Sequence, residues 1–161
     1  MGLELIAFIL CCSILPILIT ILYIRCRKNK IKEQIRGLTN NTLEMTPEQF
    51  FKMRKTSFGG RGKPSYALMQ NFEGVYILHN KTKNMYYVGQ GRQVLNRINA
   101  HFTGRGNGDV YADYKYGDVF TIKAIALQQS GFSSLNKLER NTILTYNSFA
   151  TGYNKTRGNR G

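Results

Sequence analysis

The sequence predicts an α+β chain: one N-terminal transmembrane helix, a basic linker, and a small domain whose central antiparallel three-stranded sheet is flanked by helices. Residues 5–24 form an uncharged apolar run. The stretch 74–89, GVYILHNKTKNMYYVG, has the composition of two strands joined by a polar turn, and residues 118–127 resemble a third strand. Apolar side chains at helical spacing follow in 93–102 and 133–148. A chain of 161 residues has room for one such domain and an appendage.

The run LIAFILCCSILPILITILYI, residues 5–24, would rise about 30 Å as a helix, which matches a bilayer core. A cleaved signal peptide is disfavoured, because no basic segment precedes the run and no small-residue cleavage site follows it. By the positive-inside rule the basic residues that follow predict a cytoplasmic C-terminal part: Arg25, Arg27, Lys28, Lys30 and Lys32. We therefore expect residues 1–24 to be a retained single-pass anchor in the cell membrane. Cys26 beside it is either a plain thiol or an acylation site.

Residues 25–71 are predicted to be a basic juxtamembrane linker that contains one short helix near 47–55. Thr46 suits the N-cap, Pro47 the first helical position and Gln49 the capping box. The Gly- and Arg-rich segment 59–63 could contact phosphates, although a simple linker is the favoured interpretation. The folded domain is expected over residues 72–161.

The formal net charge of +14 favours anionic partners, namely nucleic acid or an acidic membrane surface, over a merely solubilising role. The three cysteines all lie before residue 27, so that the C-terminal half has no disulfide framework and no Cys/His zinc spacing.

Two triplets bracket the predicted hairpin, Gly74-Val75-Tyr76 and Tyr87-Val88-Gly89. They resemble the paired signature of the GIY-YIG endonuclease family, with valine in both middle positions. Gly74 and Gly89 stand where a side chain would block the close approach of a ligand or of another backbone. The downstream polar residues of the family follow in the same order, so that the resemblance covers about residues 72–157.

The resemblance implies roles for four residues on the hairpin and on the helix after it. Tyr76 would accept a proton from the attacking water, and Tyr87 would position that water or the phosphate. Arg97 and His101, four residues apart, project from one helix face; alone they would be a solvated polar stripe. In the family the arginine binds the scissile phosphate, and His101 is an alternative proton relay.

Two further residues complete the implied site. Glu139 is the only acid on its predicted helix and would ordinarily be a surface residue. The resemblance makes it the ligand of Mg²⁺ or Mn²⁺, with water and phosphate oxygens filling the coordination shell. Asn154 matches the terminal asparagine that supports the site by hydrogen bonding.

Basic residues in the loops are the predicted nucleic-acid contacts. Residues 103–117, TGRGNGDVYADYKYG, form a glycine- and tyrosine-rich loop that either contacts a strand or packs its tyrosines locally. Both interpretations stay open. The predicted contacts are Lys81, Lys83, Arg105, Lys115, Lys155 and Arg157.

The function predicted from these features is a membrane-tethered, metal-dependent endonuclease that hydrolyses phosphodiester bonds of DNA. Held at the inner membrane face, it would meet incoming phage or foreign DNA. The alternative is a catalytically inactive, membrane-tethered nucleic-acid-binding module. A purely lipid-binding role is disfavoured because no basic amphipathic helix is evident.

Overall fold

The computed structural model describes residues 2–56 and 65–159, without the side chains of residues 3–13 and 68. The chain forms two compact units, Met1–Gln34 and Ile35–Gly161. The first helix, α1 (Gly2–Asn40), begins in the first unit and ends in the second. The segment 59–63, a candidate phosphate contact, lies outside the described residues.

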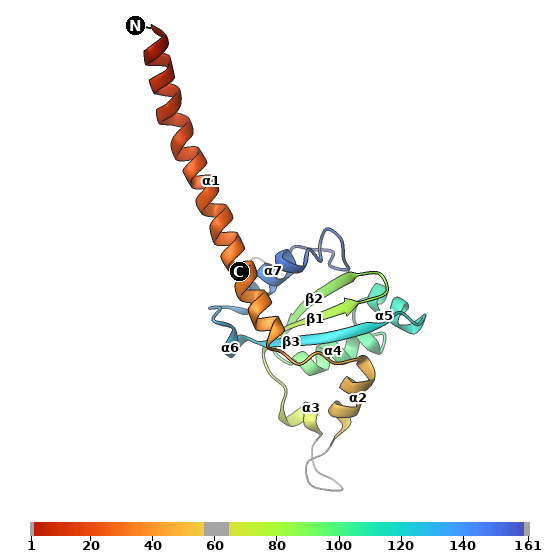
Figure 1. Cartoon of the computed structure of the whole chain (residues 1–161). Coiled ribbons are helices and arrows are strands. Elements are labelled where there is room, and N and C mark those ends of the chain that lie inside the picture. The colour runs from red at the N-terminus through yellow and green to blue at the C-terminus, as the bar shows by residue number, and fades with distance from the viewer. Residues whose placement is uncertain (1, 57–64, 160–161) are drawn as a thin grey trace. The chain divides into compact units, whose positions relative to one another are not determined.

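In the first unit residues 2–24 of the predicted anchor are helical (Figure 1). Pro16 lies inside this helix. The apolar side chains between Ile14 and Ile24 are exposed. Over the part of the chain that is described, no helix combines the length and the apolar character that a membrane crossing requires. The side chains of the first half of the predicted span are outside that part, and the anchor stays a prediction.

The second unit is built on a three-stranded antiparallel sheet of order β2-β1-β3 (Figure 1). Its strands are β1 (Gly74–Asn80), β2 (Met85–Gly91) and β3 (Phe120–Ala126). The helices of this unit beyond α1 are α2 (Pro47–Lys55), α3 (Tyr66–Met69), α4 (Val94–Phe102), α5 (Gly108–Lys115), α6 (Leu127–Ser130) and α7 (Leu135–Tyr146). The predicted fold class of this domain is confirmed.

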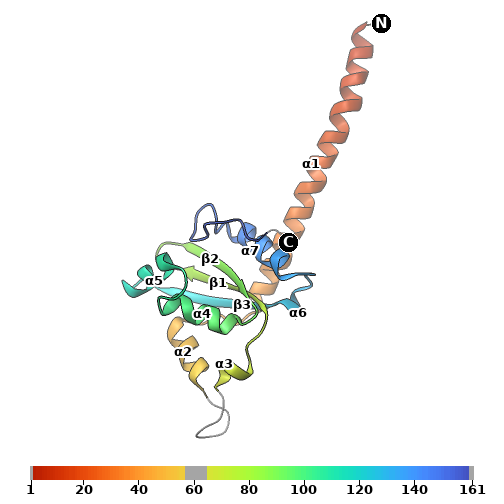
Figure 2. The same cartoon turned by 180° about the vertical axis from the view of Figure 1, so that it is seen from behind.

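Strand alternation divides the core into two layers. Tyr76 and Leu78 of β1 pack with α4 and α5, whereas Val75 and Ile77 pack with α7. Figures 1 and 2 show α4 and α5 on one side of the sheet and α7 on the other. We call these the α4 face and the α7 face. The hairpin therefore presents two differently covered surfaces.

The predicted linker differs from the structure. Ile35 and Phe50 are fully buried in the second unit, and the backbone N–H and C=O of Met45 pair with Ile122 of β3 at 3.1 and 2.9 Å. The capping box predicted for α2 forms around Thr46. Residues 35–56 belong to the folded unit, because their few apolar side chains are enough to cover one edge of the sheet.

The predicted loop 103–117 also needs correction, since α5 occupies most of it. Asn107 begins the helix, and its side-chain oxygen accepts hydrogen bonds from Asp109 and Val110 N–H. The glycines stand at the ends of α5 and leave its interior helical. Tyr114 packs edge-on against Phe102, with ring centroids 4.9 Å apart, whereas Tyr116 is exposed. Local packing therefore accounts for part of this tyrosine-rich segment.

The segment after α7 returns along β2, the free edge strand. Tyr153 N–H donates to Tyr86 C=O at 2.9 Å. The side chain of Asn154 accepts from Val88 N–H at 2.8 Å and donates to Val88 C=O at 2.7 Å. A side-chain amide thus takes the place of a neighbouring strand.

Candidate active site

Tyr76 lies at the centre of β1, completely buried, with its ring on the α4 face. Gly89 is its cross-strand partner on β2. A Cβ atom added at Gly89 would collide with the Tyr76 hydroxyl, and one at Gly74 would collide with the backbone of Ile125. Both glycines are required by close packing, as predicted, although at Gly89 the approaching group is the tyrosine itself.

His101 reaches the Tyr76 hydroxyl from α4. Its Nε2 atom lies 2.8 Å from Tyr76 Oη, and its Nδ1 atom accepts the N–H of Asn107 at 2.9 Å. Because Nδ1 is an acceptor, the neutral ring carries its proton on Nε2 and donates it to Oη. Burial, with the nearby charge of Arg97, lowers the pKa of His101 to about 4. The imidazole is therefore a neutral hydrogen-bond donor at pH 7.

This tautomer is maintained by a residue that the sequence pattern did not single out. Asn107 both caps α5 and fixes the His101 ring through its backbone. Gly106 lies against the imidazole, where a Cβ atom would come within 2.6 Å of Nδ1. The sequence signal was Asn107 followed by Asp109, an N-cap with an acid in the first helical turn.

Tyr87 and Arg97 complete the cluster around Tyr76. The Tyr87 ring is half-buried, 6.2 Å from the Tyr76 ring and 4.7 Å from the His101 ring between centroids. Arg97 is exposed on the same side of α4 as His101, and its guanidinium interacts with the Tyr76 phenol. Burial raises the pKa of Tyr76 and that of Tyr87, and the positive charge of Arg97 opposes both increases.

Glu139 projects from α7 and is only 8 % exposed. Burial raises its pKa, and its charge in turn contributes to raising the pKa of Tyr87, so the two groups are near one another. The one polar contact of its carboxylate among the described residues is Asn159 N–H, 3.4 Å from Oε2. A buried carboxylate without a cationic partner in the described part of the chain is suited to a hard divalent cation.

Within the described ranges no group of three or more His, Cys, Asp or Glu side chains could form a closed metal site. Any ion bound at Glu139 would take its remaining ligands from water and substrate, which fits magnesium better than a structural metal. The side chain of Asn154 makes its hydrogen bonds elsewhere. It holds the backbone of Val88, next to Tyr87, and so fixes the strand that carries the second tyrosine.

Three of the lysines predicted to bind nucleic acid form ion pairs with carboxylates that are distant in sequence. Lys81 pairs with Glu44 at 3.1 Å. Lys83 pairs with Asp113 at 2.6 Å. Lys155 pairs with Asp109 at 3.3 Å, although both are exposed.

The other three predicted contacts are arginines and a lysine on the surface. Arg157 lies over the ring of Phe149 at 5.2 Å. Arg105 and Lys115 are exposed and have no ion-pair partner in the described part of the chain. The charge available for a polyanion is therefore smaller around the hairpin turn than the sequence suggests.

Comparison with known proteins agrees with this arrangement. Residues 72–154 match the GIY-YIG catalytic domain. Among solved structures, a mutant of the catalytic domain of the intron endonuclease I-TevI is similar at 23 % identity, over 55 % of this chain and 98 % of that one, with a TM-score of 0.42. No curated protein matches the chain. The family match spans the sheet, the α4 cluster and Glu139, which is more than half of the chain, and the chain is therefore a member of the GIY-YIG family, an endonuclease that acts on nucleic acid.

Proposed function

We propose that this endonuclease hydrolyses phosphodiester bonds of DNA with a divalent metal ion, and that Tyr76 accepts the proton of the attacking water. One observation carries the proposal: the Tyr76 hydroxyl is hydrogen-bonded by His101 Nε2 and lies beside Tyr87 and Arg97. A phenol in such a position has donors directed at its oxygen. These donors favour the phenolate, which is the form that can act as a base.

The protonation states support different roles for His101 and Arg97 of α4. Neutral His101 donates to Tyr76 Oη and is not itself available as a base in this tautomer. A proton relay through His101 would require it to release Asn107 N–H. Arg97 supplies a permanent charge that lowers the pKa of Tyr76 against the opposing effect of burial. Its planar fork of donors can bind the scissile phosphate and offset the charge that develops there.

Because burial keeps the pKa of Tyr76 above its usual range, the phenol predominates at neutral pH. The cleavage rate should therefore increase with pH, as the phenolate fraction increases. Tyr87, whose pKa is raised as well, is suited to donate a hydrogen bond to the water or to the phosphate. The proton passes from water to the Tyr76 phenolate oxygen while the new P–O bond forms and the P–O bond to the leaving 3′-oxygen breaks.

Glu139, together with phosphate and water oxygens, would hold the divalent ion. Bound Mg²⁺ or Mn²⁺ supplies positive charge for the leaving 3′-oxygen and the phosphate. The support is the buried carboxylate, which lies near Tyr87 and has no cation paired with it among the described residues.

We further propose that residues 5–24 hold the enzyme at the inner face of the cell membrane, where it meets incoming phage or foreign DNA. The uncharged run followed by five basic residues supports this location. So do the apolar side chains exposed between Ile14 and Ile24. Substrate selection would then follow from location. In cells, a chain lacking residues 1–24 should protect less well against infecting phage, and equal protection at equal protein level would contradict the location.

The test of the chemistry uses the full chain, purified in detergent, with supercoiled plasmid and with RNA. We expect nicking of DNA with Mg²⁺ or Mn²⁺ and none with EDTA. Glu139→Gln should abolish cleavage, whereas Glu73→Gln, an exposed glutamate in the loop before β1, should retain it. Cleavage by Glu139→Gln at the wild-type rate would remove the metal assignment. Binding without any cleavage by the wild type would favour the inactive binding module.

A further inference from the structure

The helix α2 lies before the region that matches the family, yet it packs beside the helix that carries Arg97 and His101. Phe50 of α2 is completely buried. Phe51 packs edge-on against Phe102 of α4, with ring centroids 6.5 Å apart. Figures 1 and 2 show α2 on the same side of the sheet as α4. A helix outside the matched region therefore packs on the α4 face.

The last turn of α2 is strongly basic, with Lys52, Arg54 and Lys55. Basic residues at the end of a helix stabilise it against the helix dipole, and this is the simplest reason for them. Arg54, however, is directed at α4, where its Nη2 donates to Asn96 Oδ1 at 3.1 Å. Asn96 immediately precedes Arg97. The two neighbouring side chains leave α4 in different directions, so that Arg54 fixes the end of α2 on the helix that carries Arg97.

No acid compensates the positive charge of this region among the described residues. Lys52, Arg54 and Lys55 make no ion pair there, and Arg54 Nε is buried without a hydrogen-bond partner. Arg92, in the turn between β2 and α4, is exposed and likewise unpaired. The lysines of the hairpin turn, in contrast, are held by Glu44 and Asp113. Uncompensated cations on a helix that packs against α4, the helix of Arg97 and His101, are suited to a polyanionic strand.

We infer that Lys52, Arg54 and Lys55 of α2 bind the phosphates of the nucleic-acid strand that flank the scissile bond, and so extend the substrate surface beyond the family domain. The inference rests on the proposed function, because it assigns a larger footprint to the same substrate. The contacts are to phosphates and therefore independent of base sequence. Arg54, hydrogen-bonded to Asn96, holds the basic end of α2 against α4.

Binding is measured separately from cleavage, so that failure of one is not mistaken for failure of the other. The full chain carrying Glu139→Gln is titrated into fluorescently labelled duplex DNA, and affinity is followed over a range of salt concentrations. A chain that carries Lys52→Gln, Arg54→Gln and Lys55→Gln in addition to Glu139→Gln should bind the duplex roughly tenfold or more weakly than the chain with Glu139→Gln alone, near 0.1 M salt. The slope of log affinity against log salt should decrease by about 2 to 3, at ~0.9 for each phosphate contact.

Controls separate a local role from loss of folding or of charge in general. Lys52→Gln with Lys55→Gln alters only exposed side chains and should lower the slope by about 2 at an unchanged melting temperature. Lys123→Gln removes one charge on the α7 face, where Lys123 is paired with Glu44, and should leave the slope unchanged. In otherwise wild-type chains, the α2 substitutions should increase KM and leave kcat within twofold.

An unchanged salt slope in the triple variant would overturn the inference even if the wild type cleaves DNA. Loss of binding to vesicles of anionic phospholipid, with duplex affinity intact, would overturn it as well, because the α2 cations would then serve a membrane surface. A decrease in kcat at constant KM would also contradict it, since that result assigns α2 to the chemical step.

Discussion

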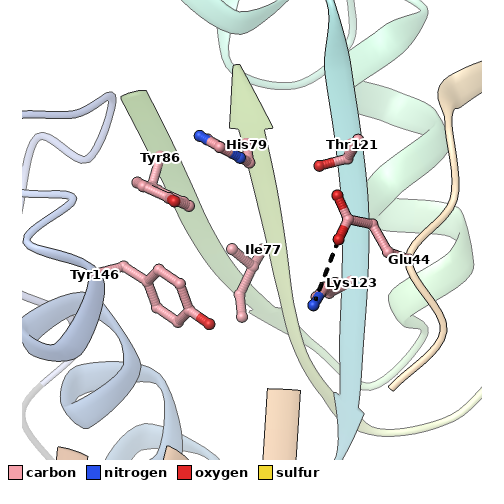
Figure 3. Close-up of a pocket in the computed structure, with 7 residues that line it drawn as sticks. All are labelled: Glu44, Ile77, His79, Tyr86, Thr121, Lys123 and Tyr146. Carbon is pink, nitrogen blue, oxygen red and sulfur yellow. Dashed lines mark ion pairs between the residues drawn. The ribbon is translucent and has the colours of Figure 1, made fainter. Parts of the chain in front are cut away.

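The two faces of the hairpin each carry a histidine beside a tyrosine, and the two pairs differ in everything except composition. On the α4 face His101 and Tyr76 are buried and joined by a 2.8 Å hydrogen bond. On the α7 face His79 and Tyr86 are partly exposed and stacked, with ring centroids 4.1 Å apart and planes 5° from parallel. Figure 3 shows this second pair at a cavity of about 160 Å³. Residue type alone therefore does not make a reactive pair.

The cations of the two faces differ in the same way. Lys123, at the cavity of Figure 3, pairs with Glu44 at 3.5 Å. A hydrogen bond from Thr121, together with Lys81 and Lys123, lowers the pKa of Glu44 to about 2, so that this carboxylate is ionised at any physiological pH. Arg97 has no such acid among the described residues. The α4 face thus keeps an arginine without an ion pair in the described part of the chain, whereas the lysine of the α7 face is neutralised by a carboxylate.

The largest effect should come from removing one hydroxyl on each face. Tyr76→Phe should reduce the single-turnover rate of plasmid nicking about 10²- to 10⁴-fold, because the proton acceptor is lost. Tyr86→Phe, the matched change on the other face, should alter the rate less than twofold. Similar rates for the two variants would show that the buried pair has no special part in the chemistry.

The second prediction concerns pH and stability. The folded chain holds the pKa of His101 at about 4, against a usual value of 6.5, so the unfolded chain takes up this proton first as the pH decreases. The neutral ring's contribution is complete above pH 6.5 and is lost progressively down to about pH 4. The loss is on the order of 3 kcal/mol in the free energy of unfolding.

Melting temperatures measured between pH 7 and pH 4 test this. His101→Gln should reduce the decrease across that window, whereas His79→Gln should retain it because His101 is still present. A decrease as steep in His101→Gln as in the wild type would assign the acid sensitivity to other groups.

The third prediction tests the space above Gly89. Gly89→Ala places a methyl group against the Tyr76 hydroxyl and should cost about 1 to 3 kcal/mol of stability, with a loss of cleavage. Gly108→Ala, at the start of α5, meets no atom within 4 Å and serves as the control. Equal melting temperatures for both variants, with cleavage intact, would mean that the tyrosine ring moves aside at little cost.

The fourth prediction concerns stability alone: Asn154→Ala leaves Val88 N–H and C=O without their partners. We expect a loss of about 1 to 3 kcal/mol, since two backbone groups lose hydrogen bonds that water replaces only in part. Asn141→Ala, on the outer part of α7, should cost less. Chemical denaturation of the full chain compares them, and a larger cost for Asn141→Ala would contradict the role of the carboxamide.

Local patterns were sufficient to predict the elements that carry the cluster. The hairpin, the strand from Phe120, and the side of α4 that bears Arg97 and His101 all follow from short-range periodicity. The two triplets at the hairpin indicate the GIY-YIG family, which composition alone does not indicate. Proximity of Glu139 to Tyr87 depended on the resemblance, since nothing in the spacing brings those two residues together.

What could not be predicted depends on contacts distant in sequence. The sequence predicts a linker around Ile35 and Phe50 because few apolar residues surround them, whereas both are fully buried and Phe50 packs with β1 and α4. The pairing of Lys83 with Asp113 spans thirty positions and removes a predicted phosphate contact. In residues 103–117 the glycines suggested a loop, although they lie at the ends of a helix.

The pairing of Asn154 with Val88 and of Met45 with Ile122 has a consequence for how molecules of this protein meet one another. Edge strands whose backbone N–H and C=O groups are unpaired can pair with a strand of another chain, and this pairing is a common route to aggregation. Here the Asn154 carboxamide pairs with backbone groups of the edge strand β2, and the backbone of Met45 pairs with the edge strand β3. The protein can therefore be crowded on a surface, as tethering would require, with less risk of self-association through its sheet.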